Sequence, residues 1–139
     1  MSDPNTIPRR LLVLRETLAE LARPDCADPV RLATDAMLRA AVERWLQVAV
    51  EACIDLAHHV ISAEGWTPPV TARGAFLTLA AHGRIELALA ERLGRAAALR
   101  NVLVHDYVAV DLAQLAHIVA HDLNDLRAFA QHAARWLGA

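Results

Sequence analysis

An all-α helical bundle is the fold class that this sequence predicts, and three observations predict it. Alanine and leucine supply 29 and 21 of the 139 positions, and both residues favour helices. Apolar residues recur at three- and four-residue spacing through most of the chain, which is the period of one helix face. Only six prolines and five glycines interrupt these periodic blocks. The length and the 55% hydrophobic content fit one compact domain over residues 1–139.

The first predicted helix covers about residues 7–23, and Pro24 ends it because proline cannot continue a helix. Four leucines form its apolar stripe: Leu11, Leu14, Leu18 and Leu21. The second predicted helix begins after Asp28, an N-cap residue that Pro29 follows at the first helical position. Its stripe continues to about Ala63, before a break formed by Gly65, Pro68 and Pro69.

Three further helices are predicted in the second half of the chain. A short helix at about 71–82 ends at Gly83, which suits the left-handed position that follows many helices. A helix at about 85–103 comes next, and the last helix begins near Asp111 and continues to about Leu137. Each stripe is apolar on one side only, so the helices must cover one another in an up-and-down bundle of about five helices. The long seams also predict a homodimer, in which one face is buried against a second copy.

The composition excludes several classes of function. All 14 basic residues are arginine, which excludes a lysine Schiff base and a P-loop lysine. The formal charge of −2 gives no overall attraction to nucleic acid, so any binding of that kind must be local.

The chain is predicted to be cytoplasmic, with reduced thiols. Cys26 and Cys53 have neither CxxC spacing nor the pattern of a disulfide framework. The first ten residues are polar and contain two prolines, unlike a signal peptide. No apolar run approaches the length of about 18 residues that a membrane span requires, so no membrane partner is expected.

The segment 100–107 gathers residue types that carry chemistry: Arg100, Asn101, His105 and Tyr107, the chain's single tyrosine. Arginine binds phosphate oxygens and stabilises charge that builds in a transition state. Histidine moves a proton from a ribose 2′-OH or to the leaving 5′-oxygen. Because the 2′-OH is then the nucleophile, no metal and no cofactor is required. The segment therefore suits cleavage of RNA.

Helix geometry limits how Arg100 and His105 act together. Five residues correspond to about 140° around an ideal helix, so the two positions do not share a face. Either the helix ends or distorts near Val104, or the two side chains cooperate across a dimer. A structural interpretation is also open, because cations near a helix C-terminus compensate the helix dipole and a lone tyrosine commonly packs half-buried.

The pattern Arg100-Asn101-x-x-x-His105-x-Tyr107 resembles the R-x4-H-x-Y motif of HepT-like toxins in the HEPN superfamily. The similarity extends to the stretches ACIDLAHHVIS, GAFLTLAAHGRI and LAERLGRAAALRNVLVHDY, which follow in the family's order, and it covers about residues 9–137. The resemblance implies a dimeric α-helical bundle in which two motifs face one another in a cleft. It also implies a metal-independent RNA endonuclease that acts as the toxin of a toxin–antitoxin pair.

The same resemblance implies a role for each motif residue. Arg100 would stabilise the phosphate, His105 would be the acid and base, and Asn101 would assist. The implied partner is a small MNT-type nucleotidyltransferase antitoxin, which would attach AMP to Tyr107 and so neutralise the toxin. An alternative from another class is a non-catalytic helical module that binds a nucleotidyltransferase.

Arg84, Arg92 and Arg95 are candidates for binding RNA outside the motif. They fall within about 80° of one another on the fourth predicted helix and would form a local basic strip. A solvated helix face is an equal alternative, because arginines on helices commonly face water.

Two clusters of histidine and aspartate contain residue types that bind metals, but we expect both clusters to lie at the surface without a metal. His117, His121 and Asp125 recur at four-residue spacing away from the apolar face of the last helix, so we expect them to face water, with His132 on the same side. The second cluster consists of Asp55, His58 and His59. It lacks a matching Glu-x-x-His pair elsewhere, so surface contacts are expected there.

Overall fold

The structure is a computed structural model that describes the backbone of residues 6–105 and 112–136 and the side chains of residues 7–99 and 112–136. The elements in chain order are α1 (Thr6–Leu21), the 3-10 helix η1 (Pro24–Ala27), α2 (Pro29–Thr34), α3 (Ala36–Glu64), α4 (Ala72–Ala81), α5 (Leu87–His105) and α6 (Leu112–Trp136). No strand occurs within these ranges. The predicted all-α bundle is therefore confirmed.

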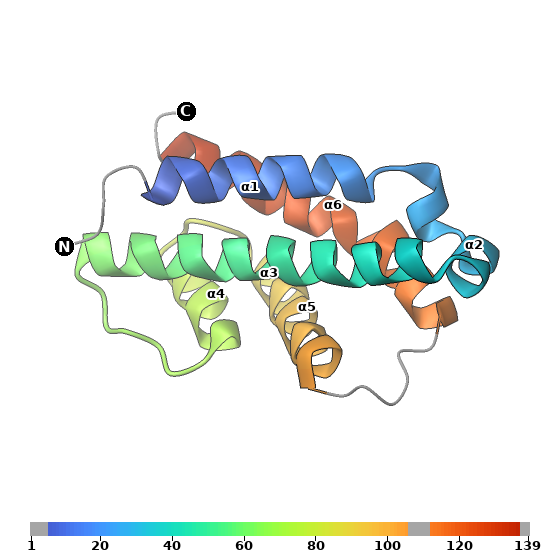
Figure 1. Cartoon of the computed structure of the whole chain (residues 1–139). Coiled ribbons are helices and arrows are strands. Elements are labelled where there is room, and N and C mark those ends of the chain that lie inside the picture. Colours follow the sequence, from blue (N-terminus) through green and yellow to red (C-terminus); the bar gives the residue numbers. More distant parts are fainter. Residues whose placement is uncertain (1–5, 106–111, 137–139) are drawn as a thin grey trace.

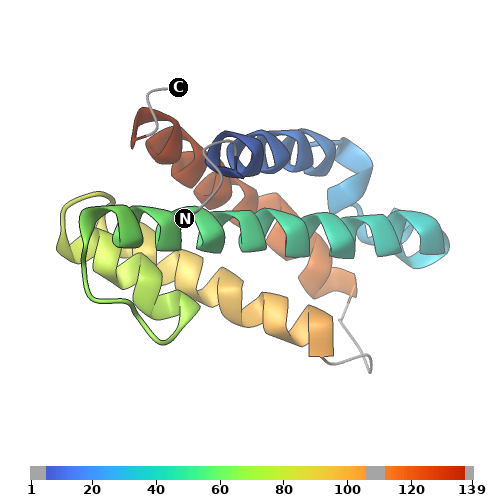
Figure 2. The same ribbon diagram turned by 60° about the vertical axis from the view of Figure 1, so that its left-hand side comes forward.

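α3 is the central helix of the bundle, and α1, α4, α5 and α6 all contact it. α1 lies along one side of α3 and runs in the opposite direction, while α4 and α5 lie on the other side (Figure 1). α6 crosses behind α3 and contacts both α1 and α5 (Figure 2). The apolar period of α3 explains this position, since its buried residues recur from Val42 to Ile61.

The predicted second helix, about 29–63, is wrong in one respect: it is two helices that meet at Asp35. The Asp35 N–H donates to the Arg31 carbonyl (2.9 Å) at the end of α2, and its carboxylate accepts from the Leu38 N–H (3.0 Å) at the start of α3. Aspartate competes well for such N-cap contacts, so it ends one helix and begins the next. The predicted N-cap at Asp28 is confirmed, because its carboxylate accepts from the Val30 N–H (3.0 Å).

Two glycines in the left-handed conformation set the other boundaries. Gly65 and Gly83 both have φ of 72° and follow the ends of α3 and α4, as their places in the sequence indicate. The Gly83 N–H donates to Ala80 (3.0 Å) and the Arg84 N–H to Leu79 (2.9 Å), which satisfies the last carbonyls of α4. α5 begins and ends about two residues later than predicted, and η1 was not predicted at all.

Both cysteines are free thiols buried in the core, as expected from their spacing. Burial raises the pKa of Cys53, which keeps this thiol protonated and unreactive. Among the described helices, none combines the length and the apolar character needed to cross a membrane.

Phe129 joins the aromatic part of the core. It is fully buried, and its ring meets those of Phe76 and Trp136 edge-on, each with a centroid separation of 5.7 Å. These contacts tie α6 to α4 and close the core at the C-terminal end of α6.

Phe129→Ala is expected to lower the free energy of unfolding by about 3–5 kcal/mol, because it removes a buried ring and leaves a cavity. Urea unfolding followed by circular dichroism measures this loss. Leu12→Ala is the matched control, since Leu12 is 55% exposed. A loss for Phe129→Ala no larger than that of the control would contradict the packing described here.

Candidate functional site

The motif lies at the C-terminal end of α5. Arg100 and Asn101 belong to its last two turns, and His105 is its final residue. The side chains of these three residues, and the whole of Tyr107, lie outside the described part of the chain. The backbone shows that α5 continues as one helix through Val104. Positions 100 and 105 are therefore separated by about 140° on a regular helix.

A three-helix seam holds the last described turns of α5 in place. Leu46 and Val50 of α3 pack with Ala96 and Leu99 of α5, and Ile118 and Leu126 of α6 complete the contact. The remaining space there is only about 10 Å³, so the three helices are closely packed at this point. Because Leu99 directly precedes Arg100, this seam fixes where the motif begins.

The three arginines of the predicted basic strip do not lie on one helix. Arg84 precedes α5, donates to a Glu64 oxygen (2.8 Å) and has its guanidinium 5.5 Å from the centroid of the Trp66 ring. The prediction placed the helix start near residue 85, whereas the turn after Gly83 delays it to Leu87. The common helical face therefore applies only to Arg92 and Arg95.

Arg92 and Arg95 line a recess of about 240 Å³ between α5 and α6, which we call the α5–α6 recess. Its other lining residues are Leu99, Gln114, Ile118 and Asp122. Arg92 Nε donates to Asp125 Oδ1 (2.9 Å), so much of its charge is neutralised. Arg95 is exposed and forms no ion pair within the described part of the chain. The positive charge of this recess therefore comes mainly from Arg95.

Asp122 is the unusual titrating group of this recess. Partial burial raises the pKa of its carboxyl, and the nearby Asp125 carboxylate raises it further. His117, His121 and Arg95 oppose this shift with positive charge. The pKa of Asp122 is raised overall, so ionisation of its carboxyl makes the folded chain less stable.

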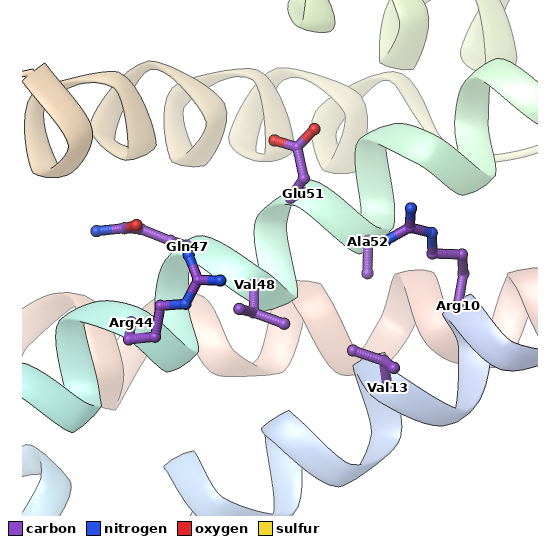
Figure 3. Close-up of a pocket in the computed structure, with 7 residues that line it drawn as sticks. All are labelled: Arg10, Val13, Arg44, Gln47, Val48, Glu51 and Ala52. Carbon is purple, nitrogen blue, oxygen red and sulfur yellow. The ribbon is translucent and has the colours of Figure 1, made fainter.

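A second hollow, the α1–α3 hollow, lies between α1 and α3 (Figure 3). It has a volume of about 270 Å³, and its lining residues are Arg10, Val13, Arg44, Gln47, Val48, Glu51 and Ala52. Arg10 Nε lies 3.4 Å from Asp55 Oδ2, an ion pair between the two helices. Arg44 is exposed and forms no ion pair with the described residues.

Sequence reasoning missed Arg10, Arg44 and Gln47, as well as Gln114 of the α5–α6 recess. Each lies outside the apolar stripe of its helix, where a single sequence gives no reason to prefer it to any other polar residue. Only the pairing of α1 with α3, and of α5 with α6, brings these side chains together.

The histidines of α6 confirm the predicted polar face in part. His117 and His121 are exposed, and their ring centroids lie 4.1 Å apart. Asp125 does not face water as predicted: its side chain is only 17% exposed because it pairs with Arg92. His132 is half-buried beside Trp136, and this burial lowers the pKa of its imidazole.

The cluster on α3 makes surface contacts, as expected. Asp55 pairs with Arg10, His58 is exposed and His59 is half-buried. Among the residues with described side chains, no group of three or more His, Cys, Asp or Glu residues has the arrangement of a metal site. His82 caps α4 and stacks on Trp66 with a centroid separation of 3.6 Å. This contact was not predicted.

The fold and the motif position define a class: an all-α bundle that carries Arg-x4-His at the end of one of its helices. The chain belongs to the ribonuclease HepT-like family, which it matches over residues 14–133. It is 37% identical to the mRNA nuclease HepT of Shewanella oneidensis over 84 residues. That alignment covers 60% of this chain and 63% of the relative, so it spans less than two thirds of the relative's length.

Solved structures resemble the whole bundle. A tri-AMPylated HEPN toxin from Shewanella oneidensis, solved in complex with an MNT antitoxin, has a TM-score of 0.83 and 29% identity, covering 95% of this chain and 97% of that one. The Bacillus subtilis protein YutE has a TM-score of 0.84 at 18% identity, covering 97% of this chain and 90% of that one. The similarity to YutE supports the fold alone.

Asp122→Asn is expected to raise the thermal unfolding midpoint at pH 7 by a few degrees. A carboxyl whose pKa is higher in the folded chain than in the unfolded chain lowers stability when the pH is above the folded pKa. It has no such effect when the pH is below its unfolded pKa, near 4. The gain should therefore be present at pH 7 and disappear near pH 3. Thermal unfolding at both pH values measures it.

Glu91→Gln is the matched control for Asp122→Asn. Glu91 is exposed on α5, and its substitution removes the same charge. A midpoint at pH 7 that falls in Asp122→Asn, relative to this control, would contradict a raised pKa.

Proposed function

We propose that this chain is a metal-independent RNA endonuclease that acts as the toxin of a toxin–antitoxin pair. The observation that carries the proposal is the family match over residues 14–133, which contains Arg100, Asn101, His105 and Tyr107 in the R-x4-H-x-Y order. The name of the Shewanella relative, an mRNA nuclease, supports RNA as the substrate class.

The chemistry follows from the residue types of the motif. His105 takes the proton of a ribose 2′-OH, and the 2′-oxygen attacks the adjacent phosphorus. The bond from phosphorus to the 5′-oxygen breaks, and that oxygen takes a proton from an imidazolium. Arg100 stabilises the charge that builds on the phosphoryl oxygens, and Asn101 donates a further hydrogen bond. The products are a 2′,3′-cyclic phosphate and a free 5′-OH.

We place this site in the cleft of a homodimer. The uninterrupted helical backbone of α5 through His105 supports this arrangement, because Arg100 and His105 do not share a face of one helix. A second copy would supply the missing partner for each residue. The His105 imidazole that takes the 2′-OH proton becomes the imidazolium that delivers it to the 5′-oxygen.

Control of the toxin is assigned to Tyr107 and to an MNT-type nucleotidyltransferase. The Tyr107 phenol oxygen would attack the α-phosphorus of ATP and release pyrophosphate, which leaves AMP on the ring. The new phosphate is negatively charged and lies two residues from His105, where it would repel the RNA backbone. The tri-AMPylated toxin solved with an MNT antitoxin supports both the partner and the modification.

His105→Ala and Arg100→Ala are each expected to lower RNA cleavage by at least about 10²-fold, the usual contribution of a positioned acid–base or charge-stabilising group. The assay follows a labelled RNA and identifies the 2′,3′-cyclic phosphate end by mass. His121→Ala is the control, because His121 is exposed on α6 and lies outside the motif.

A mixture of the Arg100→Ala and His105→Ala chains tests the dimer cleft. A mixed dimer holds one site with Arg100 from one chain and His105 from the other, so it should regain part of the activity. If either single variant cleaves RNA at the wild-type rate, the mechanism is wrong. The alternative function, a non-catalytic helical module that binds a nucleotidyltransferase, is then the better description of this chain.

Tyr107→Phe is expected to abolish AMP attachment. Intact mass after incubation with an MNT-type nucleotidyltransferase and ATP should rise by about 329 Da for each AMP on the wild type. The modified wild type should no longer cleave RNA, whereas Tyr107→Phe should keep both its mass and its activity. If Tyr107→Phe gains the same mass as the wild type, AMP is attached to another residue. That residue could not be a tyrosine, because the chain holds no other.

A further inference from the structure

The α1–α3 hollow is lined by two arginines, one glutamate (Glu51), Gln47 and an apolar floor. Arg10 approaches it from α1 and Arg44 from α3, at opposite ends of the view in Figure 3. Val13, Val48 and Ala52 line the space between them. Guanidinium groups bind phosphate oxygens with a planar set of donors, and an apolar floor suits a ribose or a base. The lining therefore matches one nucleotide unit of a polyanion.

Arg44 is the cation of this hollow that is available to a ligand, since the Glu51 carboxylate points toward the ribbon of α5 in Figure 3. Arg10 shares its charge with Asp55 at 3.4 Å, whereas Arg44 forms no ion pair in the part of the chain with described side chains. All five N–H donors of an exposed guanidinium are available to a ligand. The half-buried Gln47 adds an amide donor to the same wall.

The hollow lies at the same level of α3 as the seam that holds the last described turns of α5. Gln47 follows Leu46 in the sequence and Glu51 follows Val50, and Leu46 and Val50 belong to the seam that packs against Leu99. Glu51 points away from Val13 and toward the ribbon of α5 in Figure 3. A strand bound at the end of α5 could therefore reach the hollow by passing over α3, which lies between them.

We propose that the α1–α3 hollow binds a phosphodiester group of the RNA strand to one side of the cleaved bond, with Arg44 as the principal contact and Arg10 and Gln47 assisting. This inference rests on the proposed ribonuclease function. RNA is favoured over a partner protein because the exposed Arg44 guanidinium complements a phosphate group, which a nucleic acid carries at every nucleotide. The contact is to the backbone, so it adds affinity without selecting a sequence.

Arg44→Gln in the full chain tests the inference, with Arg31→Gln as its matched control. Arg31 is exposed on α2, lines none of the hollows described above and loses the same charge. The probe is a fluorescein-labelled single-stranded 2′-O-methyl RNA of mixed sequence. It resists cleavage because its attacking hydroxyl is blocked.

Fluorescence anisotropy over a salt series measures the binding of this probe. Arg44→Gln should bind about tenfold more weakly than wild type, and the slope of log K against log salt should fall by about 0.7, the value for one phosphate contact on a single strand. Arg31→Gln should stay within about twofold of wild type. On cleavable RNA, Arg44→Gln should raise KM and leave kcat nearly unchanged.

The outcomes separate this inference from the proposed function. If the wild type cleaves RNA but the two variants bind the probe equally, the α1–α3 hollow is not an RNA site and the ribonuclease proposal stands. If the wild type binds through Arg44 but never cleaves, the hollow stands and catalysis fails. If Arg44→Gln weakens self-association in sedimentation and leaves probe affinity intact, the hollow is a subunit contact and the inference is overturned.

Discussion

The burial of α3 is the constraint on which the rest of this structure depends. Its apolar residues contact all four of the other long helices, so its position sets theirs. One side of α3 packs with α5 and α6 through Leu46 and Val50, and another side packs with α1. The motif at the end of α5 and the α1–α3 hollow are thus held relative to one another by a single rigid helix. A change that loosens α3 would disturb both together.

The ion pairs between helices have a different role from the core. Arg10–Asp55, Arg84–Glu64 and Arg92–Asp125 each join two segments at the surface of the bundle. Exposed pairs of this kind contribute about 0–1 kcal/mol, far less than a buried aromatic ring. Their larger effect is on the surface charge, because the carboxylate of each pair neutralises one arginine that could otherwise bind a polyanion. The pairs therefore help to decide which arginines remain available to the proposed RNA substrate.

The sequence was sufficient for the fold class and for most helix ends, because both depend on local patterns. Asp28 and Gly83 act through contacts with neighbouring residues, and these follow from residue type alone. The break at Asp35 was missed because apolar residues continue at helical spacing on both sides of it, which hides a change of direction. Arg84 was misplaced for a related reason: the turn after Gly83 delays the start of α5 to Leu87, so Arg84 lies outside the helix and shares no helical face with Arg92 and Arg95.

Prediction of the candidate site from the sequence is limited in the same way, because local patterns do not show which helix faces meet. The motif could be found from the sequence because four chemically distinct residues lie within eight positions. Arg44 and Arg10 are 34 positions apart on different helices, and the apolar stripes that predict those helices carry no information about which polar faces meet. Their proximity depends on how α1 settles against α3, a property of tertiary packing. For the proposed ribonuclease, such packing matters more than composition, because an acidic chain can bind a polyanion only where tertiary structure brings arginines together.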